Sequence, residues 1–413
     1  MTNTSERIRG WTGPAILSFG FRPFFLLAGI WAALAMLLWV AMLAGHEVLP
    51  TGFDPVAWHA HEFLFGYLGA VIAGFLLTAV PNWTGRLPVV GWPLAGLVAL
   101  WLAGRLALAF AAPLPALPVA LADLAFLLAL GLFLGREIVT GRNWRNLPVL
   151  AILATFTLAN ALFHAEAAAG ANAADGYGLR LGLAAAVLLI ALIGGRIVPS
   201  FTRNWLVQRG AERLPVPFGR ADAAVLGLTL LALAAFVAAP EAWPAAGLCL
   251  AAGLANLWRL ARWQGLRTGA EPLVWVLHLG YLLLALGFLA VAAAGAGLMP
   301  QAGARHVWLA GAIGLMTLAV MTRASLGHTG RPLHAGPAVT AVYLALVLSV
   351  AARLAAAYAP GVPGLLHLAA GLWMLAFGGF AALYWPVLTR PRQKPKKVSA
   401  PPPQPPSRAV QTR

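Results

Sequence analysis

Two histidines at the start of one apolar run are the residues of this chain best placed to bind a metal. They stand in the segment Trp58-His59-Ala60-His61-Glu62, and imidazole is the commonest metal ligand in proteins. In a helix, residues two apart point roughly 200° away from each other, so the two rings would face neighbouring sites rather than one ion. The alternative is an interfacial belt, in which Trp and His present polar tips to lipid headgroups. The adjacent carboxylate of Glu62 favours metal binding.

A third candidate ligand is His306, which follows Arg305 at the start of a later apolar run. Two neutral histidines from different helices can hold a haem iron between them, and Arg305 would then be placed to pair with a haem propionate. The expected haem ligands are therefore His59, His61 and His306. The alternative is that Arg305 and His306 only begin a helix.

Copper held by imidazoles needs two or three of them, and His164 enlarges the set. It closes another apolar run as His-Ala-Glu. The candidate metal ligands are thus His59, His61, His164 and His306. These histidines lie in the halves of the apolar runs that we expect to face the outer side of the membrane. The same outer halves hold further polar residues, which we expect to line a pocket with the histidines: Glu62, Arg105, Asp123, Glu166 and Arg353.

A second kind of site is suggested by the segment SLGHTGR at 325–331. Glycines let a backbone approach a ligand closely, and His328 and Arg331 would bind a propionate, a phosphate or a quinone head group. The alternative is a tight turn that carries an arginine. Arg22 and Arg86 are further candidates for a polar pocket, although Arg22 can also extend its charge to the lipid headgroups.

Twelve hydrophobic runs carry these residues. Of the 413 residues, 61% are hydrophobic and only 10% are charged, and the mean hydropathy of +0.81 exceeds what a soluble surface permits. A helix needs about 20 apolar residues to cross a bilayer. The predicted spans are 19–44, 57–81, 91–111, 114–136, 146–169, 179–200, 222–239, 243–262, 272–296, 304–323, 336–358 and 363–387.

The runs are continuous rather than alternating, so the spans are predicted to be helices and not barrel strands. The fold class is all-α, a polytopic transmembrane helix bundle. Lys and Arg gather at the two ends of the chain and in alternate loops, which places both termini in the cytoplasm. The net charge of +16 therefore reflects topology and does not indicate nucleic-acid binding. We expect a cytoplasmic N-terminus (1–18), a membrane domain (19–389) and a disordered, basic, Pro-rich cytoplasmic tail (390–413).

Three loops on the predicted cytoplasmic side look alike, at 79–93, 197–219 and 319–337. Each leaves a helix end, passes a Thr with Arg close by, and reaches Arg-Leu-Pro or Arg-Pro near a Gly. The loops lie about four spans apart, which favours three repeats of four helices. The alternative is convergent loop chemistry, because Pro and Gly end helices anywhere.

Six motifs in order along the chain resemble the NnrS family. They are GFRPFF (20–25), WHAHEFLFGY (58–67), AGFLLTAVPNWTGR (73–86), WLAGR (101–105), GGRIVPSFTRNW (194–205) and RASLGHTGR (323–331). The resemblance covers essentially the whole membrane part. It implies a twelve-helix protein of the bacterial inner membrane that contains haem and copper and serves nitric oxide metabolism and defence against nitrosative stress. It does not indicate which residues are the ligands.

A weaker likeness is to the catalytic subunit of haem-copper oxidases, which has twelve spans and holds haem from its second and tenth. The sixth and seventh predicted spans here contain no histidine, although those helices supply the copper ligands in the oxidases. An oxidase-type binuclear centre is therefore not expected.

The sequence is consistent with three functions. The leading hypothesis is a haem and copper protein that binds or redox-processes nitric oxide or its iron-nitrosyl species, within the lipid bilayer and with an unknown electron donor. A transporter would instead use Arg22, Arg86 and Arg105 to guide an anion. An assembly factor would bind other respiratory membrane proteins and hold no haem. No nucleophile or nucleotide loop decides whether the chain is an enzyme.

Overall fold

The structure is a computed structural model that describes residues 10–393 of the chain. Every regular element in that range is a helix, which confirms the all-α prediction. Eleven of the helices are long and apolar enough to cross a membrane. Another helix, α10 (Trp243–Ala261), occupies the eighth predicted span. The polytopic helix bundle is thereby confirmed, while most of the predicted tail lies outside the described residues.

The spans follow the chain in a simple order, and two of them are interrupted by a π-helical segment. Short 3-10 helices precede the first span or lie between later ones: η1 (Ala15–Ser18), η3 (Trp144–Asn146), η4 (Ala173–Asp175) and η5 (Gly265–Thr268). The spans are α2 (Phe21–Leu43), α3 (Pro55–His61) with η2 (Glu62–Tyr67) and α4 (Leu68–Thr84), α5 (Trp92–Ala109), α6 (Ala116–Thr140), α7 (Leu147–Ala168), α8 (Tyr177–Val207), α9 (Arg220–Ala238), α10, α11 (Pro272–Gly295), α12 (Gln301–His306) with η6 (Val307–Ile313) and α13 (Gly314–His328), α14 (Pro337–Tyr358) and α15 (Gly364–Thr389).

Local signals fix where the spans begin. The carboxylate of Asp54 accepts the backbone N–H groups of Val56 and Ala57 at 2.9 and 3.0 Å, which caps α3 one turn before its histidines. The carboxylate of Glu166, at the end of α7, accepts the N–H groups of Tyr177 and Gly178 at 2.7 and 3.1 Å. The carboxylate of Glu166 therefore caps α8 and holds the start of α8 against the end of α7.

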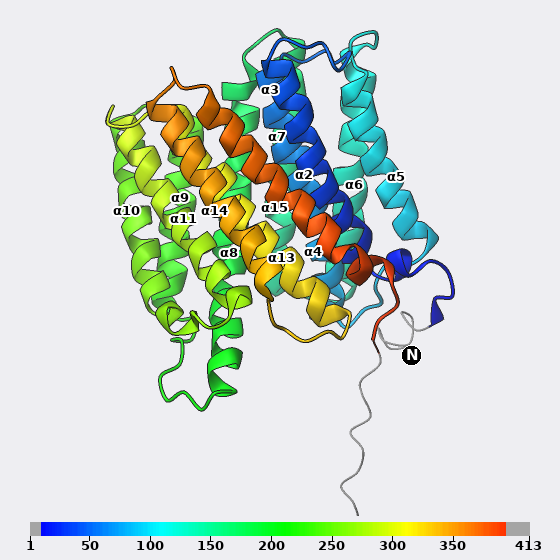
Figure 1. Ribbon diagram of the computed structural model, residues 1–413, viewed down its shortest axis with the longest axis vertical. Coiled ribbons are helices and arrows are strands. Elements are labelled where there is room, and N and C mark those ends of the chain that lie inside the picture. Colours follow the sequence, from blue (N-terminus) through cyan, green and yellow to red (C-terminus); the bar gives the residue numbers. More distant parts are fainter. Residues whose placement is uncertain (1–9, 394–413) are drawn as a thin grey trace, which may run out of the picture.

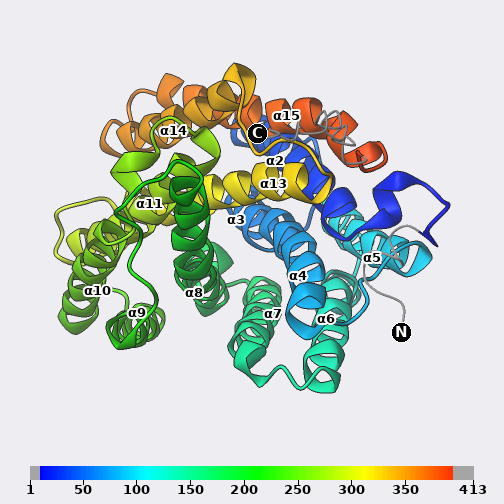
Figure 2. The same cartoon turned by 90° about the horizontal axis from the view of Figure 1, so that it is seen from below.

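The second and tenth spans, which carry His59, His61 and His306, are the most enclosed ones. The second span is 83% buried and the tenth 78% in their most apolar windows, against 33% for α5, α6 and α9. Figure 1 shows the helices packed side by side, and Figure 2, from below, shows α13 in the middle with α4 and α8 beside it and α5, α9 and α10 further out. Contacts of α4 with α13 and of α8 with η2 and η6 agree with this view. The second and tenth spans therefore face protein more than lipid, whereas the span that carries His164 is 44% buried.

Both of these spans change from α to π geometry directly after a histidine. The segment η2 begins after His61, and η6 begins after His306. The hydroxyl of Tyr67, the last residue of η2, lies 2.5 Å from that of Thr317 in α13 and joins the two spans. Segments of π-helix are rare and occur often at functional sites, and the sequence pattern did not predict them.

The described ends of the chain, at residues 10 and 393, lie at the same end of the bundle (Figure 1). An even number of crossings requires this arrangement. The cytoplasmic assignment of that end and the threefold repeat stay predictions.

We predict that Gly178→Ala destabilises the bundle. A Cβ at this position in α8 would overlap the backbone of Phe163 in α7, and overpacking of this kind costs about 1–3 kcal/mol. The measurement is thermal unfolding of the detergent-purified protein, followed by Trp fluorescence. The matched control is Gly227→Ala in α9, where a Cβ meets nothing within 4 Å. Equal melting temperatures for the two variants would contradict the close packing of α7 on α8.

Candidate functional site

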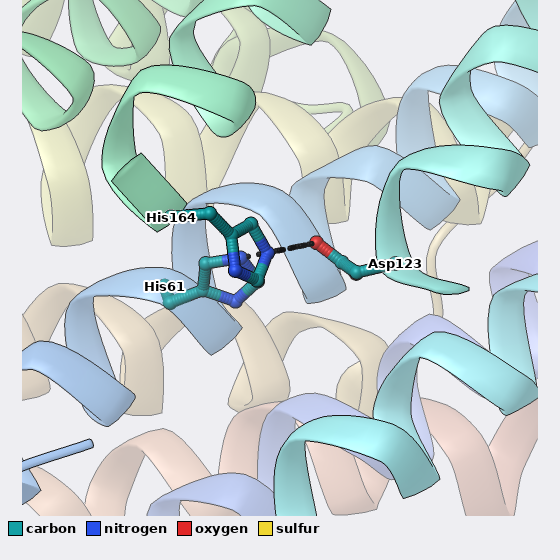
Figure 3. Close-up of side chains that lie close together, drawn as sticks. All are labelled: His61, Asp123 and His164. Atoms are coloured by element: carbon teal, nitrogen blue, oxygen red, sulfur yellow. Dashed lines mark hydrogen bonds and ion pairs between the residues drawn. The ribbon is translucent and has the colours of Figure 1, made fainter. Parts of the chain in front are cut away.

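Three spans bring a histidine, an aspartate and a second histidine together at the end of the bundle opposite the described chain ends. The three side chains are His61 at the end of α3, Asp123 in the second turn of α6, and His164 in the last turns of α7 (Figure 3). Their relative exposures are 0, 3 and 6%. Ionisable groups so deep in a membrane protein are costly and mark functional sites by default.

The spacing of the three side chains suits a metal ion. Asp123 Oδ2 lies 3.1 Å from Nε2 of His61 and 3.1 Å from Nε2 of His164. One ligand atom from each residue lies within 4.8 Å of the others. Two ligands bound at about 2.1 Å and at right angles to one another are about 3 Å apart. A small shift of these side chains would therefore centre an ion among them.

Asn160 is a fourth member of the cluster, and the sequence interpretation missed it. Its Oδ1 lies 2.8 Å from His61 Nε2, and its Nδ2 donates to Asp123 Oδ2 at 2.7 Å. Asn160 precedes His164 by four residues on α7, so both project from the same helix face. The available signal was a polar residue one turn before a histidine in an otherwise apolar run.

Arg105 links the cluster to Glu62. Its Nη1 donates to Glu62 Oε2 at 2.5 Å, and its Nη2 donates to Asp123 Oδ1. The indole of Trp31 donates to the same oxygen of Glu62 at 2.7 Å. Because Arg105 occupies Oδ1, the other oxygen of Asp123 is left for the histidines. The structure thus brings the predicted pocket residues Glu62 and Arg105 against His61 and His164.

Two glycines make room for these charged groups. A Cβ at Gly66 would overlap the guanidinium of Arg105 and lie 2.6 Å from Glu62 Oε2. A Cβ at Gly104 would lie 2.9 Å from Asp123 Oδ1. Both glycines belong to the motifs WHAHEFLFGY and WLAGR, which explains why each motif carries a glycine at that place.

The cluster holds two carboxylates but one arginine. An uncompensated buried charge is strongly destabilising, so a further positive charge at the imidazoles would stabilise the folded state. His61 Nδ1 and Glu62 Oε1 are both buried without a hydrogen-bond partner and lie 3.8 Å apart. A carboxylate beside the distal nitrogen of a histidine is the arrangement that orients metal-bound imidazoles. A protonated imidazole or a bound metal ion would supply that charge, and the pair of His61 and Glu62 is compatible with the bound metal ion.

His59 faces away from this cluster, toward the tenth span. Its ring stacks on Trp39 at a centroid distance of 4.1 Å and contacts Phe63 at 4.6 Å. It lies within electrostatic range of His306 and Arg353. His59 and His61 therefore do face different groups, as their spacing of two residues predicts.

His59 and His306 each have a ring nitrogen without a protein partner. The Nδ1 atom of His59 is buried and unbonded. His306 Nδ1 donates to the carbonyl of Ala302 at 2.6 Å, which leaves Nε2 as the atom able to bind a metal. Arg305, predicted beside His306, instead donates to Asp175 at 2.5 Å. Arg353 is the arginine whose charge acts on both histidines.

The remaining predicted site residues lie at the opposite end of the bundle. The ring of His328 packs against Phe19 and Phe21 at 5.5 and 5.6 Å. Arg22 and Arg331 donate to backbone carbonyls at the end of α15. Arg86 pairs with Glu137 beside a cavity of about 680 Å³. The predicted residues therefore divide between the two ends of the bundle.

We predict that Arg105→Met destabilises the protein far more than Arg305→Met. The first substitution leaves Glu62 and Asp123 buried without their cation, which costs about 3–5 kcal/mol. The second removes a pair whose Asp175 is 57% exposed, and such pairs contribute below about 1 kcal/mol. Thermal unfolding of both variants in one detergent makes the comparison. Similar melting temperatures would mean that the buried ion pairs do not stabilise the fold.

A comparison with known protein families agrees with the motifs and the fold. The family model described as NnrS protein matches residues 15–392, which include all twelve spans and the group of His61, Asp123 and His164. No curated protein matches the chain. The match covers far more than half of the sequence, and the chain therefore belongs to the NnrS family.

Proposed function

We propose that this chain is a haem and copper protein of the bacterial inner membrane that binds or redox-processes nitric oxide or its iron-nitrosyl species. The observation that carries the proposal is the buried group of His61, Asp123 and His164. Membership of the NnrS family supports a role connected with nitric oxide. The multi-pass fold agrees with a substrate that dissolves in lipid.

The group around Asp123 fits copper by its donor atoms. It offers two imidazole nitrogens and a carboxylate oxygen, and imidazole suits copper well. His61 and His164 would bind through Nε2 and Asp123 through Oδ2, because these atoms already converge. Arg105 holds Asp123 from its other oxygen, and Asn160 fixes the directions of His61 and Asp123. Copper bound here would supply one-electron chemistry.

His59 and His306 are the residues that fit haem. They come from different spans, lie within electrostatic range of each other, and each keeps a ring nitrogen free of protein partners. Two such histidines can bind an iron from its two sides. Arg353 is near both and would pair with an acidic side group. Haem bound here would supply one-electron chemistry, and nitric oxide would bind its iron only in place of one of the two histidines.

The residues of the chain keep the two sites separate and adjacent. The side chains of His59 and His61 project from opposite faces of the short helix α3. The proposed haem and copper sites are therefore about one helix diameter apart, roughly 10 Å. The aromatic rings of Trp39 and Phe63 pack on His59 and exclude water from its surroundings. The ion pair of Glu62 and Arg105 lies on the side of His61.

We predict that the two sites can be emptied independently. His61→Ala and His164→Ala should lower bound copper at least tenfold and leave the haem Soret band, whereas His59→Ala and His306→Ala should remove or shift the Soret band and leave copper. Metal analysis and oxidised and reduced spectra of detergent-purified protein measure both. His367→Ala is the control, because that exposed histidine only donates to the carbonyl of Pro363.

The function itself is tested by adding nitric oxide to the reduced wild-type protein. A shifted Soret band that is absent from the haem-site variants would support the proposal. Colourless and metal-free wild-type protein from haem-replete cells would refute it. That result would favour a function in transport or in assembly.

A further inference from the structure

Two arginines, one buried and one half-buried, lie together at the other end of the bundle, where α2 begins and α13 and α15 end. Arg22, in the first turn of α2, is only 3% exposed. Its Nη1 donates to the carbonyls of Leu388 and Arg390 at 2.9 and 2.7 Å. These contacts hold the start of the first span against the end of the last one, and they use one of its two terminal nitrogens.

Arg331 follows α13 and reaches the same place. Its Nη2 is 3.5 Å from the carbonyl of Pro386, and its Nη1 is buried without a hydrogen-bond partner. Arg331 is close enough to Arg22 for their charges to repel. Burial, and the nearby charge of Arg390, lower the pKa of Arg331 below its ordinary value. This part of the bundle therefore has a strongly positive potential.

Among residues 10–393, no carboxylate lies within 4.0 Å of either arginine. The ion pairs in that range use the other arginines Arg86, Arg105, Arg259, Arg262 and Arg305. The carbonyls and the dipole at the end of α15 offset part of the positive charge. Two neighbouring guanidinium groups, one of them with a buried free N–H, still favour an anion between them.

The surroundings indicate what kind of anion this is. The arginines lie at the ends of three spans, which is the depth of the lipid headgroups. Apolar side chains close in sequence to Arg331 and to the end of α15 are exposed on the bundle surface, namely Leu333 at 46%, Leu383 at 40% and Trp385 at 54%. Guanidinium groups match phosphate oxygens with two parallel hydrogen bonds. A phosphate that is joined to acyl chains satisfies both the charged and the apolar part of this site.

We propose that Arg22 and Arg331 form a binding site for the phosphate of an anionic phospholipid. The lipid would join α2, α13 and α15 at the end of the bundle remote from the metal cluster. The site uses neither His59 nor His61 and is independent of the proposed redox function. A free phosphate ion shares the headgroup chemistry but would gain nothing from the exposed apolar side chains.

The test measures lipid binding to purified full-length protein in a neutral detergent. Phosphatidylglycerol, phosphatidylcholine or inorganic phosphate is added to separate samples, and thermal unfolding and native mass spectrometry are recorded. We expect phosphatidylglycerol to raise the melting temperature and to remain bound, and the other two to have little effect. Arg331→Gln should weaken phosphatidylglycerol binding about tenfold, and Arg331→Lys should retain part of it.

Arg22→Lys provides a second variant, because Arg22→Ala would also remove the contacts that hold α15. The control is Arg209→Gln, an exposed arginine at the same end of the bundle that packs on Trp205. Unchanged binding of phosphatidylglycerol to both Arg331→Gln and Arg22→Lys would overturn the proposal. Inorganic phosphate that reproduces the full stabilisation would overturn the lipid assignment and identify a free anion as the ligand.

Discussion

The need to neutralise buried charge within the bundle governs the arrangement of the site. Glu62 and Asp123 come from different spans and would repel each other, but Arg105 lies between them and donates to both. In a low-dielectric interior such contacts are much stronger than in water, and they are needed because the desolvation cost is large. The guanidinium therefore sets the distance between the second and fourth spans, and it also determines which oxygen of Asp123 meets the histidines.

The same principle recurs elsewhere in the bundle without a ligand. Arg259 is fully buried, and its Nε donates to Asp222 at 3.0 Å while its Nη1 donates to the hydroxyl of Tyr281 at 2.9 Å. There Arg259 and Arg262 both pair with Asp222. In the His61 cluster two carboxylates share one arginine, Arg105. This difference separates a structural ion pair from a cluster in which a protonated imidazole or a bound cation would supply the missing charge.

Sequence reasoning could predict the spans because each is a long apolar run that length and composition identify. It could also select His61, His164, Glu62 and Arg105, because ionisable residues in such runs are rare. It could not predict that Arg305 pairs with Asp175 or that Arg353 lies near His59, since those contacts depend on how distant spans pack. Asn160 was overlooked because one amide in an apolar helix resembles a packing residue. Hydrophobic periodicity also carries no signal for a π segment, so η2 and η6 were not predicted.

The π segments have a consequence for how the two sites tolerate change in chain length. A π turn holds one residue more than an α turn, and one residue rotates the preceding helix by about 100°. In the second span, η2 lies between the histidines and the rest of the helix. Loss of one residue there would turn His59 and His61 away from Trp39 and Asp123 together, while every side chain kept its chemical identity. The partner that each histidine meets is thus set by a count of residues as well as by their types.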